Sequence, residues 1–227
     1  MAKPAAPTNV AASEDDSAKV VISWTKSTGA TGYKVYRNLK ITNASFENWS
    51  GGGSVAPDGW FLFGTDEEVQ RYSGTVYSGT YSAKIKLNGT NCGLYQKIHE
   101  TEGIAAWQGK TVTWRAWVYV SKANTARIAI IGDDGTTTYS SYHSGVAGWE
   151  RLTVTATVGA NATYLQLRCQ VNTNDVYAYF DNSEGEVLVA EVGDVATADD
   201  TSAHAPQITA GSTAVSYTHL TLPTIYS

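Results

Sequence analysis

The run KTVTWRAWVYVS, residues 110–121, alternates strictly between two kinds of side chain. With the two-residue period of a β-strand, one face collects apolar side chains only: Val112, Trp114, Ala116, Val118 and Val120. The other face is too aromatic for an ordinary solvated surface and too polar for a core, because it collects Thr113, Arg115, Trp117 and Tyr119. We therefore expect the first set to face a core and the second set to form a recognition surface.

The run YLQLRCQV, residues 164–171, divides in the same way. Its apolar face comprises Leu165, Leu167, Cys169 and Val171. Its polar face comprises Tyr164, Gln166, Arg168 and Gln170. If the two strands lie in one sheet, their polar faces form a single patch of aromatic rings with amide and guanidinium donors.

Such a patch suits a sugar, whose ring has an apolar face of C–H groups and a rim of hydroxyls. Trp117 and Tyr119 would stack on the apolar face of the sugar. The hydroxyls would be bound by the four hydrogen-bonding side chains of the patch, Arg115, Gln166, Arg168 and Gln170. A solvated sheet face with ordinary cross-strand pairs would give the same pattern, so both interpretations stay open on the alternation alone.

Six blocks in order along the chain resemble the family 4/9 carbohydrate-binding modules. They are SFENW (45–49), APDGW (56–60), GTYSAKI (79–85), GKTVTWRAWV (109–118), GWERLTVTATV (148–158) and AYFDN (178–182). The resemblance implies a jelly-roll β-sandwich that binds glycans without cleaving them. This sequence departs from the family pattern at Val112, where an aromatic residue is common, and at Arg115, where a small residue is.

The same resemblance implies a structural calcium ion. Its carboxylate ligands would be Glu47 and Asp181, with backbone carbonyls from Gly79–Lys84, and the ion would join distant parts of the chain. The alternative is that both carboxylates make hydrogen bonds at the sheet edge. The resemblance also leaves a second site location open, at the end of the sandwich, where Trp60 and Phe61 would line the loop after Pro57.

Other groups that could do chemistry have simpler explanations. Residues 133–135, Asp-Asp-Gly, are expected to form a hairpin turn rather than a metal or acid pair. The glutamates at 67–68 and 100–102 are not framed by an aromatic cleft, so paired-carboxylate hydrolysis is not expected. His143 has no Ser/Asp partner at a triad spacing, and Trp149, at the head of a strand, is expected in the core. We expect no catalytic residue.

Composition supports a β-protein that does not bind nucleic acid. Thr, Ser, Gly, Val and Tyr are abundant, which favours β-structure. Seven runs separated by turn residues predict the strands of an all-β antiparallel sandwich: YSAKIKL, GLYQKI, KTVTWRAWVYVS, TARIAIIG, WERLTVTATV, ATYLQLRCQV and VYAYFDN. A net charge of −5 provides no basic field for a phosphate backbone. No apolar run reaches the roughly 20 residues of a membrane helix, and the start of the chain lacks a secretory signal. We expect an extracellular or virion-associated protein.

Four segments are expected along the chain. Residues 1–37 resemble the first three strands of a fibronectin type III domain, with Trp24 as the core tryptophan, and residues 38–190 form the carbohydrate-binding module. Residues 191–214 are interpreted as a linker or a truncated next module. Residues 215–227 are interpreted as a non-native tail of a metagenomic fragment, because 215–224 resemble a sequencing adapter translated in frame; a genuine C-terminal strand is the alternative.

Two questions stay open at this stage. The leading function is a glycan-binding module that tethers a larger protein, such as a glycoside hydrolase, to polysaccharide. The rival is a structural or adhesive domain of a phage tail or head fibre, in which a homo-oligomer would bury Trp117. Cys92 and Cys169, the two cysteines, could pair, but two cysteines in a large domain do not imply a disulfide.

Overall fold

The computed structural model describes most of the chain, as two compact units. The described residues are 8–12, 19–25, 28, 30, 32–64, 67–89, 91–193, 207–209 and 224–225. One unit comprises residues 39–185, and the other comprises residues 1–38 together with 186–227. Within the described ranges there is no helix with the length and apolar character that a membrane crossing requires.

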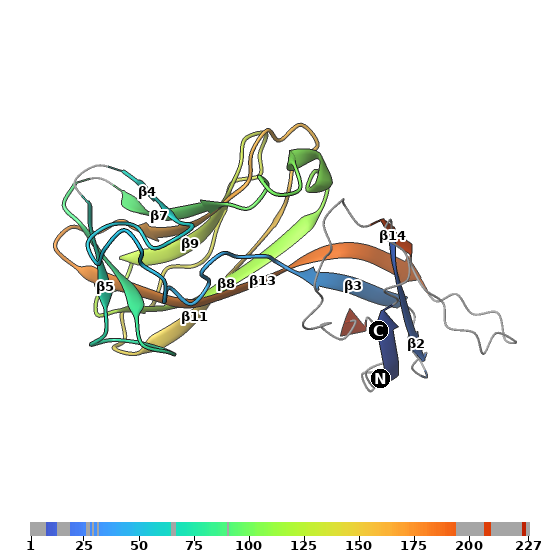
Figure 1. Cartoon of the computed structure of the whole chain (residues 1–227), viewed down its shortest axis with the longest axis horizontal. Coiled ribbons are helices and arrows are strands. Elements are labelled where there is room, and N and C mark those ends of the chain that lie inside the picture. The colour runs from blue at the N-terminus through green and yellow to red at the C-terminus, as the bar shows by residue number, and fades with distance from the viewer. Residues whose placement is uncertain are drawn as a thin grey trace, which may run out of the picture. The chain divides into compact units, whose positions relative to one another are not determined.

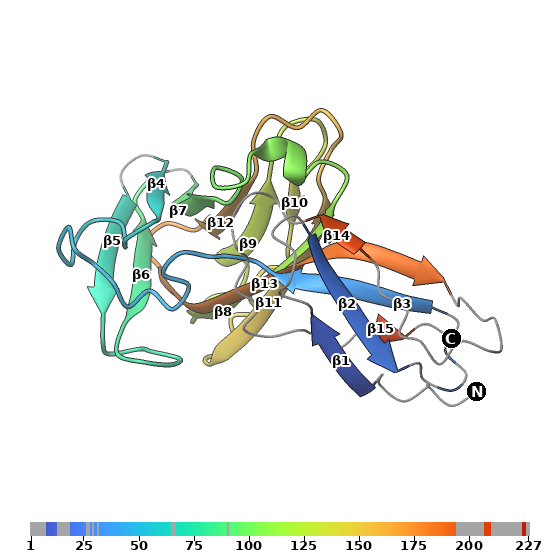
Figure 2. The same cartoon turned by 45° about the vertical axis from the view of Figure 1, so that its right-hand side comes forward.

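The unit of residues 39–185 is a sandwich of two β-sheets, whose two layers can be followed in Figures 1 and 2. The first sheet has the strand order β10 (Thr138–Tyr139), β9 (Ala126–Ile131), β12 (Gln166–Val171), β7 (Cys92–Lys97) and β4 (Phe61–Phe63). The second has the order β11 (Trp149–Thr157), β8 (Thr111–Val120), β13 (Tyr177–Gly193), β6 (Ser82–Leu87) and β5 (Glu67–Tyr72). A short 3-10 helix, η1 (Ile104–Ala106), precedes β8.

Neighbouring strands in the first sheet are antiparallel, as are β8 with β11 and β6 with both β5 and β13. The predicted all-β jelly-roll sandwich is therefore confirmed. Two strands of this unit, β4 and β5, were not anticipated, because they are short or carry mixed side chains.

The core lies between the two sheets and follows the predicted alternation. All five apolar residues of β8, from Val112 to Val120, are fully buried. Leu165, Leu167, Cys169 and Val171 are also fully buried, beside or on β12. The Trp114 indole N–H donates a hydrogen bond to Ser183 Oγ at 2.6 Å, so its polar group is satisfied inside the core. Both predicted core faces are confirmed.

The second unit is built from short strands. β2 (Lys19–Thr25) pairs with β1 (Thr8–Ala12) and with β14 (Gln207–Thr209). β3 (Gly32–Asn38) pairs with residues 186–193 of β13 and with β15 (Thr224–Ile225). The fibronectin type III interpretation stays a prediction, and the side chain of Trp24 lies outside the described residues. So do residues 194–206 and 210–223, which contain most of the expected linker and adapter-like tail.

Both cysteines are fully buried in the sandwich core, and they do not form a disulfide with each other. Cys92 and Cys169 lie on the paired strands β7 and β12, where Cys169 is opposite Leu94 and Cys92 is opposite Val171. Burial raises the pKa of the Cys169 thiol well above its ordinary value, so the reactive thiolate is disfavoured.

We predict that the native protein reacts with a thiol reagent such as DTNB only as fast as it unfolds. In urea without reductant, both thiols should react at once, because no disulfide has to be broken. The measurement is the absorbance of released thionitrobenzoate. If thionitrobenzoate is released in urea only after the protein has been reduced, Cys92 and Cys169 are instead paired in a disulfide.

Candidate functional site

The two strands expected to build one patch lie in different sheets. β8 belongs to the second sheet and β12 to the first, so their outward sides point away from each other across the sandwich (Figure 1). We call the outward side of the first sheet the β12 face and that of the second the β8 face. The prediction of a single patch is wrong, and its residues divide between the β8 face (Arg115, Trp117, Tyr119) and the β12 face (Gln166, Arg168, Gln170).

A row of side chains crosses the β12 face at right angles to its strands. Strand register places Phe61 of β4 opposite Tyr95 of β7, and Tyr95 opposite Arg168 of β12. Arg168 is in turn opposite Ala129 of β9, which is opposite Tyr139 of β10. The row therefore has aromatic rings at both ends and a guanidinium group between them.

The rings in this row are held and exposed. Phe61 stacks on Tyr95 with ring centroids 5.4 Å apart and an interplanar angle of 30°. Phe61 is 50% exposed and Tyr139, at the other end, is 43% exposed. Exposed rings on a rigid sheet can accept the C–H face of a sugar without ordering themselves first.

Amide side chains hold two arginines on this face. Gln166 Oε1 accepts hydrogen bonds from Arg168 Nε at 3.0 Å and Nη2 at 2.8 Å. Gln170 Oε1 accepts one from Arg127 Nε at 2.6 Å, and Gln170 Nε2 donates one to Asn91 Oδ1 at 2.6 Å. Gln170 is only 3% exposed, so it orients Arg127 and cannot itself bind a ligand, contrary to the prediction.

A pocket adjoins the Phe61 end of the β12 face. Its lining includes Lys40, Thr42, Phe61, Gln96 and Lys97. The buried Gln96 side chain exchanges two hydrogen bonds with the Thr42 backbone, at 2.8 and 2.9 Å. The pocket wall is therefore rigid, and the surface available to a ligand continues past Phe61 over the edge of the sheet.

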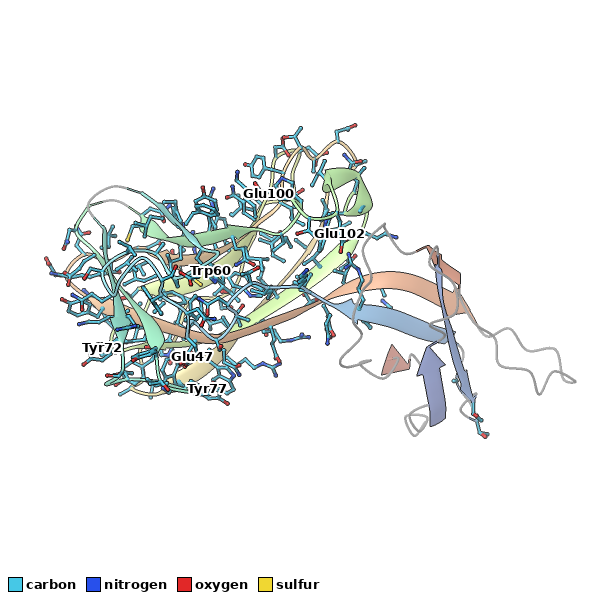
Figure 3. All side chains as sticks on the ribbon, viewed as in Figure 1. Glu47, Trp60, Tyr72, Tyr77, Glu100 and Glu102 are labelled. Carbon is cyan, nitrogen blue, oxygen red and sulfur yellow. The ribbon has the colours of Figure 1, made fainter. Side chains whose placement is uncertain are left out.

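Trp60, a predicted ligand-binding residue, belongs to the core. It is 3% exposed, and in Figure 3 it lies between the two layers of strands. Its ring packs 4.9 Å from Phe46, and its N–H donates to the carbonyl of Thr42 at 3.1 Å. The prediction for Trp60 is wrong, and the exposed ring of this loop is its neighbour Phe61.

The β8 face carries a continuous cluster of rings. Trp117 stacks on Tyr77 with centroids 4.0 Å apart and an angle of 14°, so one side of the Trp117 ring is covered. Tyr119 contacts Trp149 at 5.9 Å and Tyr179 at 5.7 Å. Trp149 is half-buried on this face opposite Tyr119, so its expected place in the core is wrong. Arg115 lies on the same face, opposite Thr153.

Two carboxylates hold the segment of residues 77–81 against the sandwich. Glu47 Oε1 accepts hydrogen bonds from the backbone N–H groups of Thr80 at 2.9 Å and Tyr81 at 3.1 Å. Asp181 Oδ2 accepts them from Tyr77 at 2.9 Å and Ser78 at 3.0 Å. In Figure 3 Glu47 and Tyr77 lie close together. Burial raises the pKa of the Asp181 carboxyl, and the negative charge of Glu47 adds to this, although backbone N–H groups lower it.

These two carboxylates are the pair expected to bind calcium, and their chemistry fits the ion. Glu47 Oε2 accepts no hydrogen bond from the described residues, so a hard oxygen is available there. A Cβ on Gly79 would collide with the Glu47 carboxylate, so glycine is what lets that carboxylate approach the segment. The described ranges hold no group of three or more Asp, Glu, His or Cys, so further ligands would be neutral oxygens such as backbone carbonyls.

The other candidate groups have structural roles. Asp134 and Gly135 both have positive φ, 50° and 84°, and form the predicted turn between β9 and β10. Asp133 accepts hydrogen bonds from the hydroxyl and N–H of Thr163, which lower the pKa of its carboxyl. His143 is fully buried; its Nδ1 accepts from Gly145 N–H, so Nε2 donates to the carbonyl of Gly148.

Sequence reasoning missed four residues of the β12 face: Phe63, Tyr95, Arg127 and Tyr139. Tyr95 and Arg127 occupy the outward positions of strands that were predicted, so extending the alternation to those strands would have identified them. Tyr139 lies in a strand of two residues, which is too short to show a period.

No protein-family model matches the chain. Chitinase A1 of Niallia circulans is 26% identical over 156 residues, which cover 67% of this chain and 19% of that protein. The chain thus spans about a fifth of the length of the curated relative it matches.

Solved structures with similar folds include the CBM22-1 xylan-binding domain of Xyn10C from Paenibacillus barcinonensis, with a TM-score of 0.49, 14% identity and coverage of 72% of this chain and 99% of that one. TmCBM61 in complex with β-1,4-galactotriose gives a TM-score of 0.45 at 16% identity, covering 66% of this chain and 97% of that one. The enzymatically active domain of tailspike protein 4 of bacteriophage CBA120 gives a TM-score of 0.46 at 15% sequence identity, covering 66% of this chain and 21% of that one.

We predict that Gly79→Ala destabilises the sandwich more than Gly109→Ala. The two glycines have nearly the same φ, +74° and +73°, but the Cβ position of Gly109 is open whereas that of Gly79 meets Glu47. Both changes should cost about 1–2 kcal/mol for the left-handed backbone. Gly79→Ala should cost about 1–3 kcal/mol more, for the displaced Glu47 hydrogen bonds.

Urea unfolding of both variants measures the difference. In a Glu47→Ala background the excess cost of Gly79→Ala should disappear, because the colliding carboxylate is gone. Equal costs in the wild-type background would contradict the role assigned to Glu47.

Proposed function

We propose that the unit of residues 39–185 binds polysaccharide on the β12 face and does not cleave it. The observation that carries the proposal is the row across this face, in which the stacked pair Phe61–Tyr95 and the exposed Tyr139 flank Arg168. Rings accept the apolar face of a sugar, and a guanidinium group between them donates to its oxygens.

The chemistry of this face supports binding rather than hydrolysis. The glutamate that borders it, Glu100, is paired with Lys97 at 3.1 Å, and Figure 3 shows Glu100 and Glu102 together at one end of the sandwich. Retaining and inverting glycosidases need two carboxylates across the scissile bond. The strand positions that form the row, from Phe61 through Tyr95, Arg168 and Ala129 to Tyr139, include no Asp or Glu.

The expected affinity is modest, in the micromolar to millimolar range, because an open sheet face leaves much of the ligand in water. Such a module would act by raising the local concentration of a protein that carries it. Because the chain matches about a fifth of a chitinase, we propose further that it is carried as an accessory module by a glycoside hydrolase.

The β8 face remains the second candidate location, through Trp117, Tyr119 and Arg115. On this face the predicted platform ring, Trp117, is half-buried and stacked against Tyr77. A sugar there would first meet Tyr77, which is 40% exposed.

Binding of the full chain to a panel of soluble polysaccharides tests the proposal and separates the faces. Tyr95→Ala should weaken binding by about tenfold or more, equivalent to about 1.4 kcal/mol, because a platform ring and its support of Phe61 are lost. Trp117→Ala, an aromatic deletion on the opposite side of the sandwich, serves as the matched control. Isothermal titration calorimetry measures the affinity, and the melting temperature confirms that each variant is folded.

Binding that survives Tyr95→Ala and is lost in Trp117→Ala would move the site to the β8 face. Failure of every polysaccharide to bind would refute glycan binding. A structural role in a fibre would then be the better account, and a trimeric mass in solution would support it.

We also propose that Glu47 and Asp181 hold a calcium ion together with backbone carbonyls of Gly79–Lys84. Supporting observations are the convergence of both carboxylates on one backbone segment and the oxygen of Glu47 that has no hydrogen bond within the described part of the chain. The ion would neutralise two nearby negative charges and tighten the hold on residues 77–81.

Calcium at about a hundredfold excess over its dissociation constant should stabilise the sandwich by about 2.7 kcal/mol. At roughly 2–4 °C per kcal/mol, the melting temperature should rise by about 5–10 °C relative to protein in chelator. Glu47→Gln should remove this increment, whereas Glu100→Gln, far from the pair, should retain it. An unchanged melting temperature in calcium and chelator would refute the site and leave the carboxylates as a metal-free clamp.

A further inference from the structure

Two arginines of the β12 face have only neutral partners within the described part of the chain. Arg127 is bound by Gln170 and stacks on the ring of Tyr139, with Cζ 3.7 Å from the centroid. Arg168 is bound by Gln166 and lies 4.8 Å from the ring centroid of Phe63. Three other basic groups of this unit pair with carboxylates instead: Lys86 with Asp175, Arg151 with Glu184, and Lys97, at the edge of the same face, with Glu100.

Both guanidinium groups are held in place and keep unused donors. Arg127 donates a hydrogen bond to Gln170 through Nε, and its two Nη groups donate to no described residue. Arg168 uses Nε and Nη2 for Gln166, which leaves Nη1. Stacking on rings and bonding to amides fix the side chains, so little entropy remains to be lost when a ligand arrives.

The same hydrogen bonds remove acceptors from the face. The carbonyl oxygens of Gln166 and Gln170 are both occupied by arginine N–H groups, and Gln170 is buried. What remains at the centre of the face is therefore a surplus of cationic donors. Sugar hydroxyls both donate and accept, whereas a carboxylate only accepts and matches the arginine fork.

The two arginines are close enough to serve one ligand. Arg168 is opposite Ala129 and Gln170 is opposite Arg127, so Arg127 and Arg168 are diagonal neighbours on adjacent antiparallel strands. The Cα atoms of such diagonal neighbours are roughly 7–8 Å apart. The rings of Phe61, Tyr95 and Tyr139 flank both positions, so a sugar and its acidic substituent can be bound together.

From this arrangement we propose that the polysaccharide recognised by the β12 face carries acidic sugars, namely uronate residues whose carboxylates bind Arg127 and Arg168. This inference rests on the proposed function, because it specifies the ligand class of the same face.

The test compares polymers that differ only in charge, using the full chain. The pairs are polygalacturonate with its methyl ester, and glucuronoxylan with its carboxyl-reduced form. At least one acidic polymer should bind about tenfold or more tightly than its neutral partner, and the ratio should shrink as NaCl rises from about 0.05 M to about 0.5 M. Arg168→Gln and Arg127→Gln should each reduce the ratio towards one.

Arg151→Gln is the matched control, because it removes the same charge from the β8 face. A final arm compares dextran sulfate with dextran. If Arg151→Gln weakens the binding of dextran sulfate as much as Arg168→Gln does, the attraction is bulk electrostatic attraction, and the inference is overturned.

The remaining outcomes separate the two proposals. Equal binding of acidic and neutral partners, or binding confined to neutral glycans, overturns the uronate inference while glycan binding stands. If no polymer binds, acidic or neutral, both proposals fail. Retention of the acidic preference in both arginine variants would also refute the inference, since the charge would then be read elsewhere.

Discussion

The burial of apolar side chains between two sheets determines the direction of all the others. In β8 and β12 every second residue is fully buried, and moving either strand by one position would expose that whole set to water. Burial of one such side chain is worth about 1.5–3 kcal/mol, so the register of these strands is strongly specified. The arginines, amides and rings of the two outward faces are therefore presented in a geometry that the core imposes.

On the β12 face a second layer of organisation follows from hydrogen bonds. Asn91 bonds Gln170, Gln170 bonds Arg127, and the rings of Tyr139 and Tyr142 pack on that guanidinium. Each partner restricts the next, so a strand-end asparagine contributes to the orientation of an arginine at the surface. On the β8 face the organising contacts are instead those of Glu47 and Asp181 with one backbone segment, which brings Tyr77 onto Trp117.

The sequence was sufficient to predict most strands, the two core faces and the turn at Asp134-Gly135, because period-two alternation and turn residues are local signals. It was insufficient to decide which strands share a sheet, since pairing is a long-range property that periodicity does not encode. This is why Trp117 and Arg168 were assigned to one patch. Trp60 was predicted at the surface incorrectly because its loop has no alternation of apolar and polar residues that would show whether a side chain points inward or outward.

Trp149 is a different case, because the signal was present and was not used. Leu152, Val154 and Ala156 alternate inward along the same strand, so the residue three positions before Leu152 must point outward. The amides of Gln166 and Gln170 were correctly placed on the polar side of β12. Their use as supports for arginines could not be predicted, because it depends on a neighbouring strand.

The distribution of tryptophan has a consequence for optical experiments. The aromatic residues of the β12 face are phenylalanine and tyrosine, whereas Trp49, Trp60, Trp107 and Trp114 are buried and Trp117 and Trp149 lie on the β8 face. Emission from these six tryptophans will therefore report mainly on the packing of the core and on the segment that covers Trp117. A ligand seated on the β12 face would leave that emission nearly unchanged, so an absence of quenching carries no information about binding there.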